Sequence, residues 1–296
     1  MGHIRDKIPV HGCSSMSNRS LGLLTALLLF VLQPAGAADD PCSAAVPVDL
    51  SFLRTGTTLF GELHGNAESP AVFLAAVCDA VSQRGAVVHV ALELPFQIQP
   101  HLDRYFSSKN STKAREAFLA QPFWHRRTAG QDGRSSTAMW ELVQQLRQVD
   151  QAYESFQGVV AVAGRRQEAA EAYQALNHSA YLAGNIAEIA AELDSGRDYV
   201  LALVGNFHAS RQAPGGLEHM KPAAAYLGAE ASTVLLLPTG GESWSCSEGC
   251  GTRAVYEPEN PDKFVRASQR EGGFDHVVVI GPVTSSPPLF LLRDTP

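Results

Sequence analysis

The sequence has no block of basic residues, and its net charge at pH 7 is −7, with a pI near 5.8. A chain with this charge balance is a poor partner for nucleic acid or for an anionic membrane surface. Charged residues make up only 18% of the chain, against 45% hydrophobic residues. This composition argues against a disordered protein and predicts a globular one with a substantial core.

Three widespread catalytic signatures are missing from the sequence. It has no Gly-x-Ser-x-Gly elbow, no His-Glu-x-x-His motif and no Walker loop. These absences argue against a standard serine hydrolase, a zincin and a P-loop NTPase. Any catalytic site must therefore be built from other residues.

One long apolar run lies near the N-terminus, from Leu21 to Leu32, between Arg19 and the small residues that end at Ala38. This pattern predicts a signal peptide over residues 1–37, whose apolar run is too short to span a bilayer. The mature chain is then expected to be periplasmic or secreted, with no membrane span. Met16 is a better start than the first methionine, so residues 1–15 could be a start-site artefact. An uncleaved anchor is the alternative, and no lipidation motif stands at the cleavage point.

Cysteine is scarce, with five in the chain and four after removal of the leader. An even number in an exported chain suggests disulfide bonds. Four cysteines allow three pairings, and we expect the local pair Cys246–Cys250 together with Cys42–Cys78. A zinc–thiolate site is the rival interpretation, but the spacing lacks paired Cys-x-x-Cys units.

Short apolar runs alternate with helical patterns after the leader, which predicts an α/β fold with a mainly parallel sheet flanked by helices, in one domain over residues 38–296. Helices are expected at 69–83, beginning with Ser69 and Pro70, at 136–151 and at 167–193. Residues 96–155 are expected to form a helical cap inserted after the second strand, and 239–262 a long polar loop. The expected strands are 57–60, 86–92, 159–163, 199–204, 233–237 and 276–280.

Two Gly-x-x-His motifs each follow a strand-like run: one ends at His64 and the other at His208. Glu62 lies two residues before His64, so both side chains point to one side of an extended segment. Glu93 ends another strand-like run. Ligands bind at the carboxyl ends of parallel strands, so we expect these four residues to share a site.

Such a set of side chains suits two kinds of chemistry. A carboxylate can orient a histidine that acts as a general base, and we expect Glu62, His64, Glu93 and His208 to be catalytic in this sense. The same four residues could instead hold a divalent metal of unknown identity through N and O ligands. A single histidine at a strand end is more often structural, but the joint occurrence of all four favours a functional site.

Basic residues elsewhere are candidates for binding substrate. His125 and Arg126 lie in the expected cap, and Arg165 follows the expected third strand. These side chains could bind an anionic or polar substrate, or they could lie in solvated loops. The segment from Asp132 to Ser136 is open to the same two interpretations.

The paired motifs, together with Ala91-Leu92-Glu93-Leu94-Pro95, resemble a superfamily that groups the erythromycin-esterase-like enzymes, the haem-binding ChaN-like lipoproteins and the Tiki/TraB proteins. The resemblance spans about residues 55–285. It departs from the family pattern at His178, where relatives often have arginine. The lipidation cysteine of the haem-binding members is absent as well.

Two functions follow from the residues and the resemblance. The first is an exported hydrolase, acting on a small-molecule or peptide substrate through an ester, lactone or peptide bond, in which His64 is the base, oriented by Glu62 or Glu93. His208 would then stabilise the oxyanion or bind a metal. The alternative is a protein of haem or iron uptake that catalyses no reaction and ligates haem through His64 or His208.

Overall fold

The computed structural model describes residues 40–82, 85–109, 111–125, 132–164, 178–194, 196–246, 249–257 and 273–293. All of them belong to one compact unit, Asp39–Pro296. The expected signal peptide over residues 1–37 lies outside the described residues. No helix in the described part of the chain is long and apolar enough to cross a membrane.

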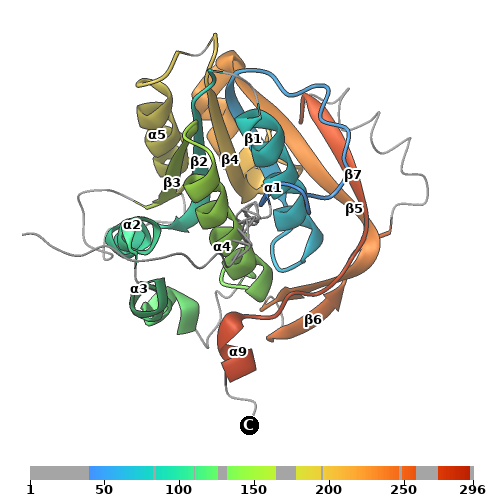
Figure 1. Ribbon diagram of the computed structural model, residues 1–296. Helices are drawn as coiled ribbons and strands as arrows, with labels where there is room; N and C mark the ends of the chain where they lie inside the picture. Colours follow the sequence, from blue (N-terminus) through green and yellow to red (C-terminus); the bar gives the residue numbers. More distant parts are fainter. Residues whose placement is uncertain are drawn as a thin grey trace, which may run out of the picture. The chain divides into compact units, whose positions relative to one another are not determined.

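The fold is built on a seven-stranded sheet with the order β3-β2-β4-β1-β5-β6, in which β7 also pairs with β5 (Figure 1). Every pairing is parallel except that of β5 with β6. The mainly parallel α/β sheet expected from the sequence is therefore confirmed. The strands are β1 Gly56–Glu62, β2 Val88–Pro95, β3 Phe156–Ala163, β4 Tyr199–Gly205, β5 Ala231–Ser245, β6 Gly251–Ala254 and β7 His276–Val283.

The register of the three central strands brings their carboxyl ends together. Strand β4 lies between β1 and β2, with Glu62 opposite Gly205 in one ladder and Leu92 opposite Leu203 in the other. Glu93, the next residue along β2, therefore ends near the same row as Glu62. The parallel topology thus places both acidic residues at one edge of the sheet, beside the start of the second Gly-x-x-His motif.

Helices cover both faces of the sheet (Figure 1). Alternate residues of β4 face opposite sides, so that Leu201 and Leu203 pack into one core cluster, whereas Val200 and Ala202 pack into the other. Helices α1 and α4 cover the first face, and α5 and α7 the second. The helix bounds are α1 Glu68–Val81, α2 Gln99–Ser107, α3 Ser111–Leu119, α4 Thr137–Ala152, α5 His178–Ala190, α6 Asn206–Ala209, α7 Ala223–Leu227 and α9 Leu289–Arg293, with short 3-10 helices η1 Phe96–Ile98, η2 Pro122–His125 and η5 Gly228–Glu230.

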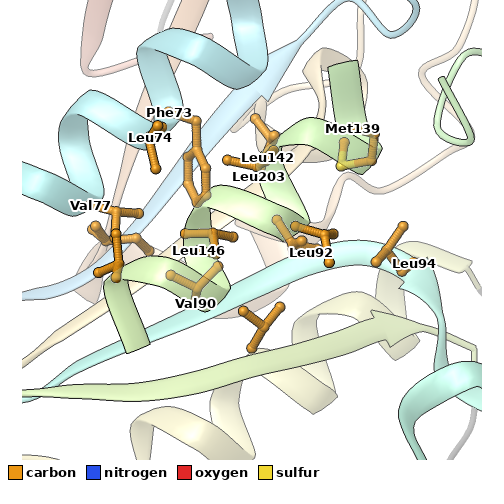
Figure 2. Packing of buried hydrophobic residues seen from close by; sticks show 14 of the residues in the cluster. Phe73, Leu74, Val77, Val90, Leu92, Leu94, Met139, Leu142, Leu146 and Leu203 are labelled. Carbon is orange, nitrogen blue, oxygen red and sulfur yellow. The ribbon is translucent and has the colours of Figure 1, made fainter. Parts of the chain in front are cut away.

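Aliphatic and aromatic side chains of α1, α4 and β2 interdigitate in the larger core cluster. Phe73 of α1, Leu142 of α4 and Leu92 of β2 all belong to this cluster (Figure 2). All three side chains are buried. This packing fixes β2 against the helices, and with it the position of Glu93 at the end of the strand.

The segment after β2 is helical, as expected, and comprises η1, α2, α3, η2 and α4. Four rings, Tyr105, Phe118, Trp124 and Trp140, pack against one another at centroid distances of 5.3–6.1 Å. Ser136 caps α4 by accepting a hydrogen bond from the Met139 N–H. The N-cap of α4 and the packed rings explain why this insertion holds a defined position beside the sheet.

Two details of the expected secondary structure are wrong. Helix α1 begins at Glu68, with Ala67 at its N-cap, so Ser69 lies inside the first turn. The Asn66 side chain accepts the Ser69 N–H instead, which explains the misplaced boundary. The long loop expected after residue 238 is also wrong in its first part, because β5 continues to Ser245 and turns back through β6. Residues 258–262 of that loop lie outside the described residues.

Both expected disulfide bonds are present. Cys42–Cys78 ties the segment before β1 to α1 across a sequence separation of 36 residues. Cys246–Cys250 closes a separation of only 4 residues at the end of β5. A longer closed loop removes more conformational entropy from the unfolded chain, so the two bonds differ in their expected contribution to stability.

We expect replacement of both Cys42 and Cys78 by alanine to lower the free energy of unfolding by about 4 kcal/mol, against about 2 kcal/mol for the Cys246/Cys250 pair. Urea unfolding of the two double variants, followed by circular dichroism, measures the difference. Equal losses in the two variants would contradict the assignment of the main stabilising cross-link to the N-terminal segment.

Candidate functional site

The Glu93 carboxylate lies at the centre of a polar cluster at the carboxyl edge of the sheet. Its Oε1 accepts hydrogen bonds from Arg134 Nη1 and His178 Nε2, both at 2.9 Å. Its Oε2 accepts the Gly205 N–H at 2.7 Å. The side chain is only 5% exposed. A buried carboxylate needs several donors of this kind, so Glu93 binds three segments of the chain to one another.

His64 and Glu62 form a pair beside this carboxylate. The Nδ1 atom of His64 lies 2.9 Å from Glu62 Oε1, and its Nε2 lies 3.7 Å from Glu93 Oε2. An ionised carboxylate only accepts hydrogen bonds, so Nδ1 carries the proton in the neutral imidazole. The tautomer therefore leaves the lone pair on Nε2, the nitrogen on the side of Glu93.

His208 lies on α6, the short helix that directly follows β4. Its Nδ1 atom is 2.9 Å from Ser179 Oγ, and its Nε2 is 3.8 Å from Glu93 Oε1. The His178 ring packs edge-on against it, with 4.8 Å between the ring centroids. His178 and Ser179 are the first two residues of α5, so this helix holds both histidines at Glu93.

The segment Asp132–Arg134 reaches the site from the helical insertion. Asp132 accepts hydrogen bonds from the Arg134 side chain at 2.8 Å and 2.6 Å, which orients the guanidinium toward Glu93. Gly133 has φ +94°, and a Cβ there would lie 2.4 Å from the Gly65 Cα. Only glycine allows this contact with the residue after His64, and it brings Arg134 to the cluster.

Two other positions require glycine because neighbouring atoms lie too close to admit a Cβ. Neither of these glycines has a positive φ. A Cβ at Gly205 would lie 3.0 Å from His64 Nε2. One at Gly61 would lie 2.9 Å from the Ala209 Cβ, so this glycine admits α6 next to β1. Gly61 lies within β1, and its role is to make room for the helix that carries His208.

The charges around the site move the pKa values of the two motif histidines in opposite directions. Burial alone would lower the pKa of His64, but the carboxylates of Glu62, Glu93 and Asp132 outweigh it and raise that pKa above its usual value. Burial lowers the pKa of His208 to about 4, and nearby positive groups add to the shift against the opposing effect of Glu93. At neutral pH, His208 is therefore a neutral imidazole.

Arg134 holds the pKa of Glu93 well below its usual range, even though burial alone would raise it. Hydrogen bonding by His178 lowers it further. The pKa of Asp132 is also lowered: burial opposes this shift, but the Arg134 guanidinium outweighs it. Both carboxylates are therefore ionised, and the cluster combines fixed negative and positive charges.

These side chains line a cavity of about 510 Å³, which we call the charged cavity. The volume lies within the range of small-molecule sites. Ser243, Ser245 and Cys246 of the β5 extension and its disulfide form part of the wall. The other lining residues are Glu62, Leu63, His64, Glu93, Asp132, Arg134, His178, Gly205, Asn206, Phe207 and His208.

Three of these residues could hold a metal ion. One donor atom from each of Glu93, His178 and His208 lies within 4.8 Å of the other two. Two imidazoles and one carboxylate are the ligands of several catalytic zinc and iron sites, so the donor set fits a divalent ion by type. This donor set differs from the expected set of four residues. It includes His178, whereas His64 and Glu62 form a pair with each other.

The structure brings all four motif residues, Glu62, His64, Glu93 and His208, to one cavity. It does not bring His125 there. This side chain is exposed at the end of η2, its Nε2 lies 2.7 Å from the Leu119 carbonyl oxygen, and it does not line the charged cavity. The other two expected substrate-binding residues, Arg126 and Arg165, lie outside the described residues.

His178 and Ser179 were not expected at the site, and Asp132 and Arg134 were open to two interpretations. One signal could have found His178. It lies on α5, in the crossover from β3 to β4, and such a crossover leaves β3 at the sheet edge where ligands bind. No comparable short-range signal exists for Arg134, because its position depends on contacts of Gly133 with a distant segment.

No family model matches the chain, and no curated protein matches it. Solved structures match in fold. A Bacillus cereus protein aligns with a TM-score of 0.54 at 12% identity, covering 80% of this chain and 90% of that one. A succinoglycan biosynthesis protein gives 0.52 at 10% identity, covering 78% and 89%. An erythromycin esterase, EreC, gives 0.51 at 10% identity, covering 79% and 91%. At these identities the likeness shows that the chain shares its fold with these proteins.

Proposed function

We propose that this chain is an exported hydrolase that activates water for attack on an ester, lactone or peptide bond. The observation that carries the proposal is the orientation of His64. Its Nδ1 is held by Glu62, and its Nε2 faces a cavity that also contains Arg134 and His208. A carboxylate that orients an imidazole leaves the second ring nitrogen able to take a proton from water.

The proposed reaction balances with these residues. The oxygen of a water molecule attacks the carbonyl carbon as its proton passes to His64 Nε2. The bond between the carbonyl carbon and the leaving oxygen or nitrogen then breaks, and the leaving group takes up this proton from Nε2. Arg134 and neutral His208 lie near the other carboxylate oxygen of Glu93, Oε1, and can donate hydrogen bonds to the carbonyl oxygen as negative charge develops on it. Glu62 keeps the tautomer fixed throughout.

A metal would add to this chemistry. If a divalent ion binds at Glu93, His178 and His208, it supplies a Lewis acid that polarises the carbonyl group and lowers the pKa of bound water. His64, oriented by Glu62, remains the general base in either case. The Arg134 guanidinium, 2.9 Å from Glu93 Oε1, would then neutralise part of the ligand charge.

The haem alternative is less favoured by the walls of the cavity. The charged cavity has seven ionisable side chains among its described residues, namely Glu62, His64, Glu93, Asp132, Arg134, His178 and His208. An exported location also belongs to the proposal. The two disulfide bonds support it, because such bonds persist in oxidising compartments.

Replacing His64 by alanine should lower kcat/KM for hydrolysis of activated esters by about 10²- to 10⁴-fold, the usual contribution of a general base. The exposed His219 is the matched control, and His219→Ala should leave the rate unchanged. Steady-state kinetics on p-nitrophenyl acetate and on a lactone, with thermal melts of each variant, make the measurement. Full activity in a folded His64→Ala variant would refute the proposal.

The pH profile tests the pair formed by Glu62 and His64. The base acts only when it is unprotonated, so activity should rise with pH through the raised pKa of His64. Glu62→Gln removes the nearest carboxylate that raises this pKa, so the acidic limb of the kcat/KM profile should move to lower pH. The plateau rate should fall as well, because the imidazole loses its orientation. An unmoved limb would show that a group other than His64 titrates.

Metal binding separates the two ligand sets. Protein purified without a His-tag should lose affinity for Zn²⁺ by at least about 100-fold when His178 is replaced by alanine, because a direct ligand is removed. His64→Ala should keep most of the affinity. Isothermal titration of the apoprotein with Zn²⁺ measures both. Equal losses of Zn²⁺ affinity in the two variants would instead favour the ligand set expected from the sequence.

A further inference from the structure

A second cavity, of about 540 Å³, lies next to the charged cavity. We call it the apolar cavity, because six of the described residues that line it have apolar side chains, three have polar ones and none is charged. Its lining residues are Asn206, Phe207, Ser210, Gln212, Ala213, Pro214, Gly215, Leu217, Leu235, Gly273 and Phe274. Its uncharged walls thus contrast with those of the charged cavity on the other side of α6, where carboxylates, imidazoles and a guanidinium group lie.

The two cavities share part of a wall. Asn206 and Phe207 line both of them. These residues lie between Gly205, which donates to Glu93, and His208. The Phe207 and His208 rings pack edge to face, with 5.2 Å between their centroids. A molecule that lies over these two residues would have one end near the reacting groups and the other near the apolar side chains of the second cavity.

The floor of the apolar cavity also adjoins the first motif. Leu235 of β5 pairs with Gly61, the residue before Glu62. The Phe274 ring lies over the same glycine, 3.3 Å from where a Cβ would stand. Apolar side chains thus continue up to the strand that ends in the Glu62–His64 pair.

The walls are tied together by an ion pair. The Arg211 side chain binds Asp275 at 2.5 Å and 2.9 Å, and the Arg211 N–H donates to the Gly273 carbonyl. Arg211 belongs to the wall segment after α6, and Asp275 directly follows Phe274. These contacts hold both walls in place before any ligand binds, which lowers the entropic cost of binding.

Apolar side chains at this cavity remain in contact with water. Leu217 is 38% exposed, although it lines a concave surface. Its backbone is fixed by hydrogen bonds to Pro214 and from Met220. A ligand with an apolar group would remove this surface from water, which favours binding.

We propose that the apolar cavity binds an uncharged hydrocarbon group of the substrate, attached to the carbonyl or the alcohol side of the bond cleaved in the charged cavity. This inference rests on the proposed hydrolase function and adds its substrate class: esters or lactones with an extended apolar portion. Short, polar esters occupy the charged cavity alone and are poorer substrates.

Leu217→Glu tests the proposal, because the change places a charge in the apolar cavity at a side chain that is already partly exposed. The matched control is Leu291→Glu on α9, where the leucine is 37% exposed and does not line the cavity. Thermal melts establish that both variants fold. Two substrate series are used: p-nitrophenyl esters from acetate to octanoate, and alkyl acetates from ethyl to octyl.

In the wild-type protein, kcat/KM should rise along one of the two series, and that series identifies the side of the bond that enters the cavity. Leu217→Glu should lower kcat/KM for the longest member by about tenfold and leave the shortest unchanged. Leu291→Glu should change neither. An equal change for short and long substrates in Leu217→Glu would overturn the proposal while leaving the hydrolase function in place.

A binding measurement separates this proposal from the hydrolase function. The neutral apolar dye N-phenyl-naphthylamine should bind to the wild type and to His64→Ala, with its affinity lowered about tenfold by Leu217→Glu. Unchanged dye binding in Leu217→Glu would overturn the cavity assignment. Dye binding that depends on Leu217, in a protein that cleaves no ester, would uphold the apolar site and refute the hydrolase function instead.

Discussion

The site depends on one buried charge, the carboxylate of Glu93. It accepts hydrogen bonds from the β4 backbone at Gly205, from the insertion through Arg134 and from α5 through His178. An ion in this position is costly unless each segment stays in place, and loss of one donor leaves an uncompensated charge. The same contacts therefore hold the sheet, the insertion and the helices around the cavity and set the charge that the histidines experience.

Most of the fold and half of the cluster follow from short-range patterns in the sequence. Strands covered on both faces give continuous apolar runs, so β1, β2 and β4 are recognisable, and the polar residues that end them mark the functional edge. Glu62, Glu93 and the two motif histidines are found in this way. Their convergence needs the strand order, with β4 between β1 and β2, which the chain order alone does not give.

The remaining features depend on contacts between distant segments. Arg134 reaches Glu93 only because Gly133 packs against the backbone of Gly65, and nothing near Arg134 in the sequence records that contact. The sequence does not predict the continuation of β5, because Gly240 and Gly241 interrupt its apolar pattern. Both glycines have positive φ values. A Cβ at Gly241 would clash with the Val283 backbone, so this glycine serves the pairing with β7 and does not end the strand.

The division of work between the two motif histidines follows from how many carboxylates each one faces. His64 lies near Glu62, Glu93 and Asp132, which together overcome the effect of burial, so its Nε2 is basic enough to take a proton. Burial lowers the pKa of His208, Glu93 is the carboxylate that opposes this, and Arg134 and two imidazoles add to the lowering, so His208 remains neutral. A neutral imidazole is suited to donating a hydrogen bond or ligating a metal, and is too weak a base to compete for the proton. The two Gly-x-x-His motifs are alike in sequence, but the surrounding charges assign them different chemistry.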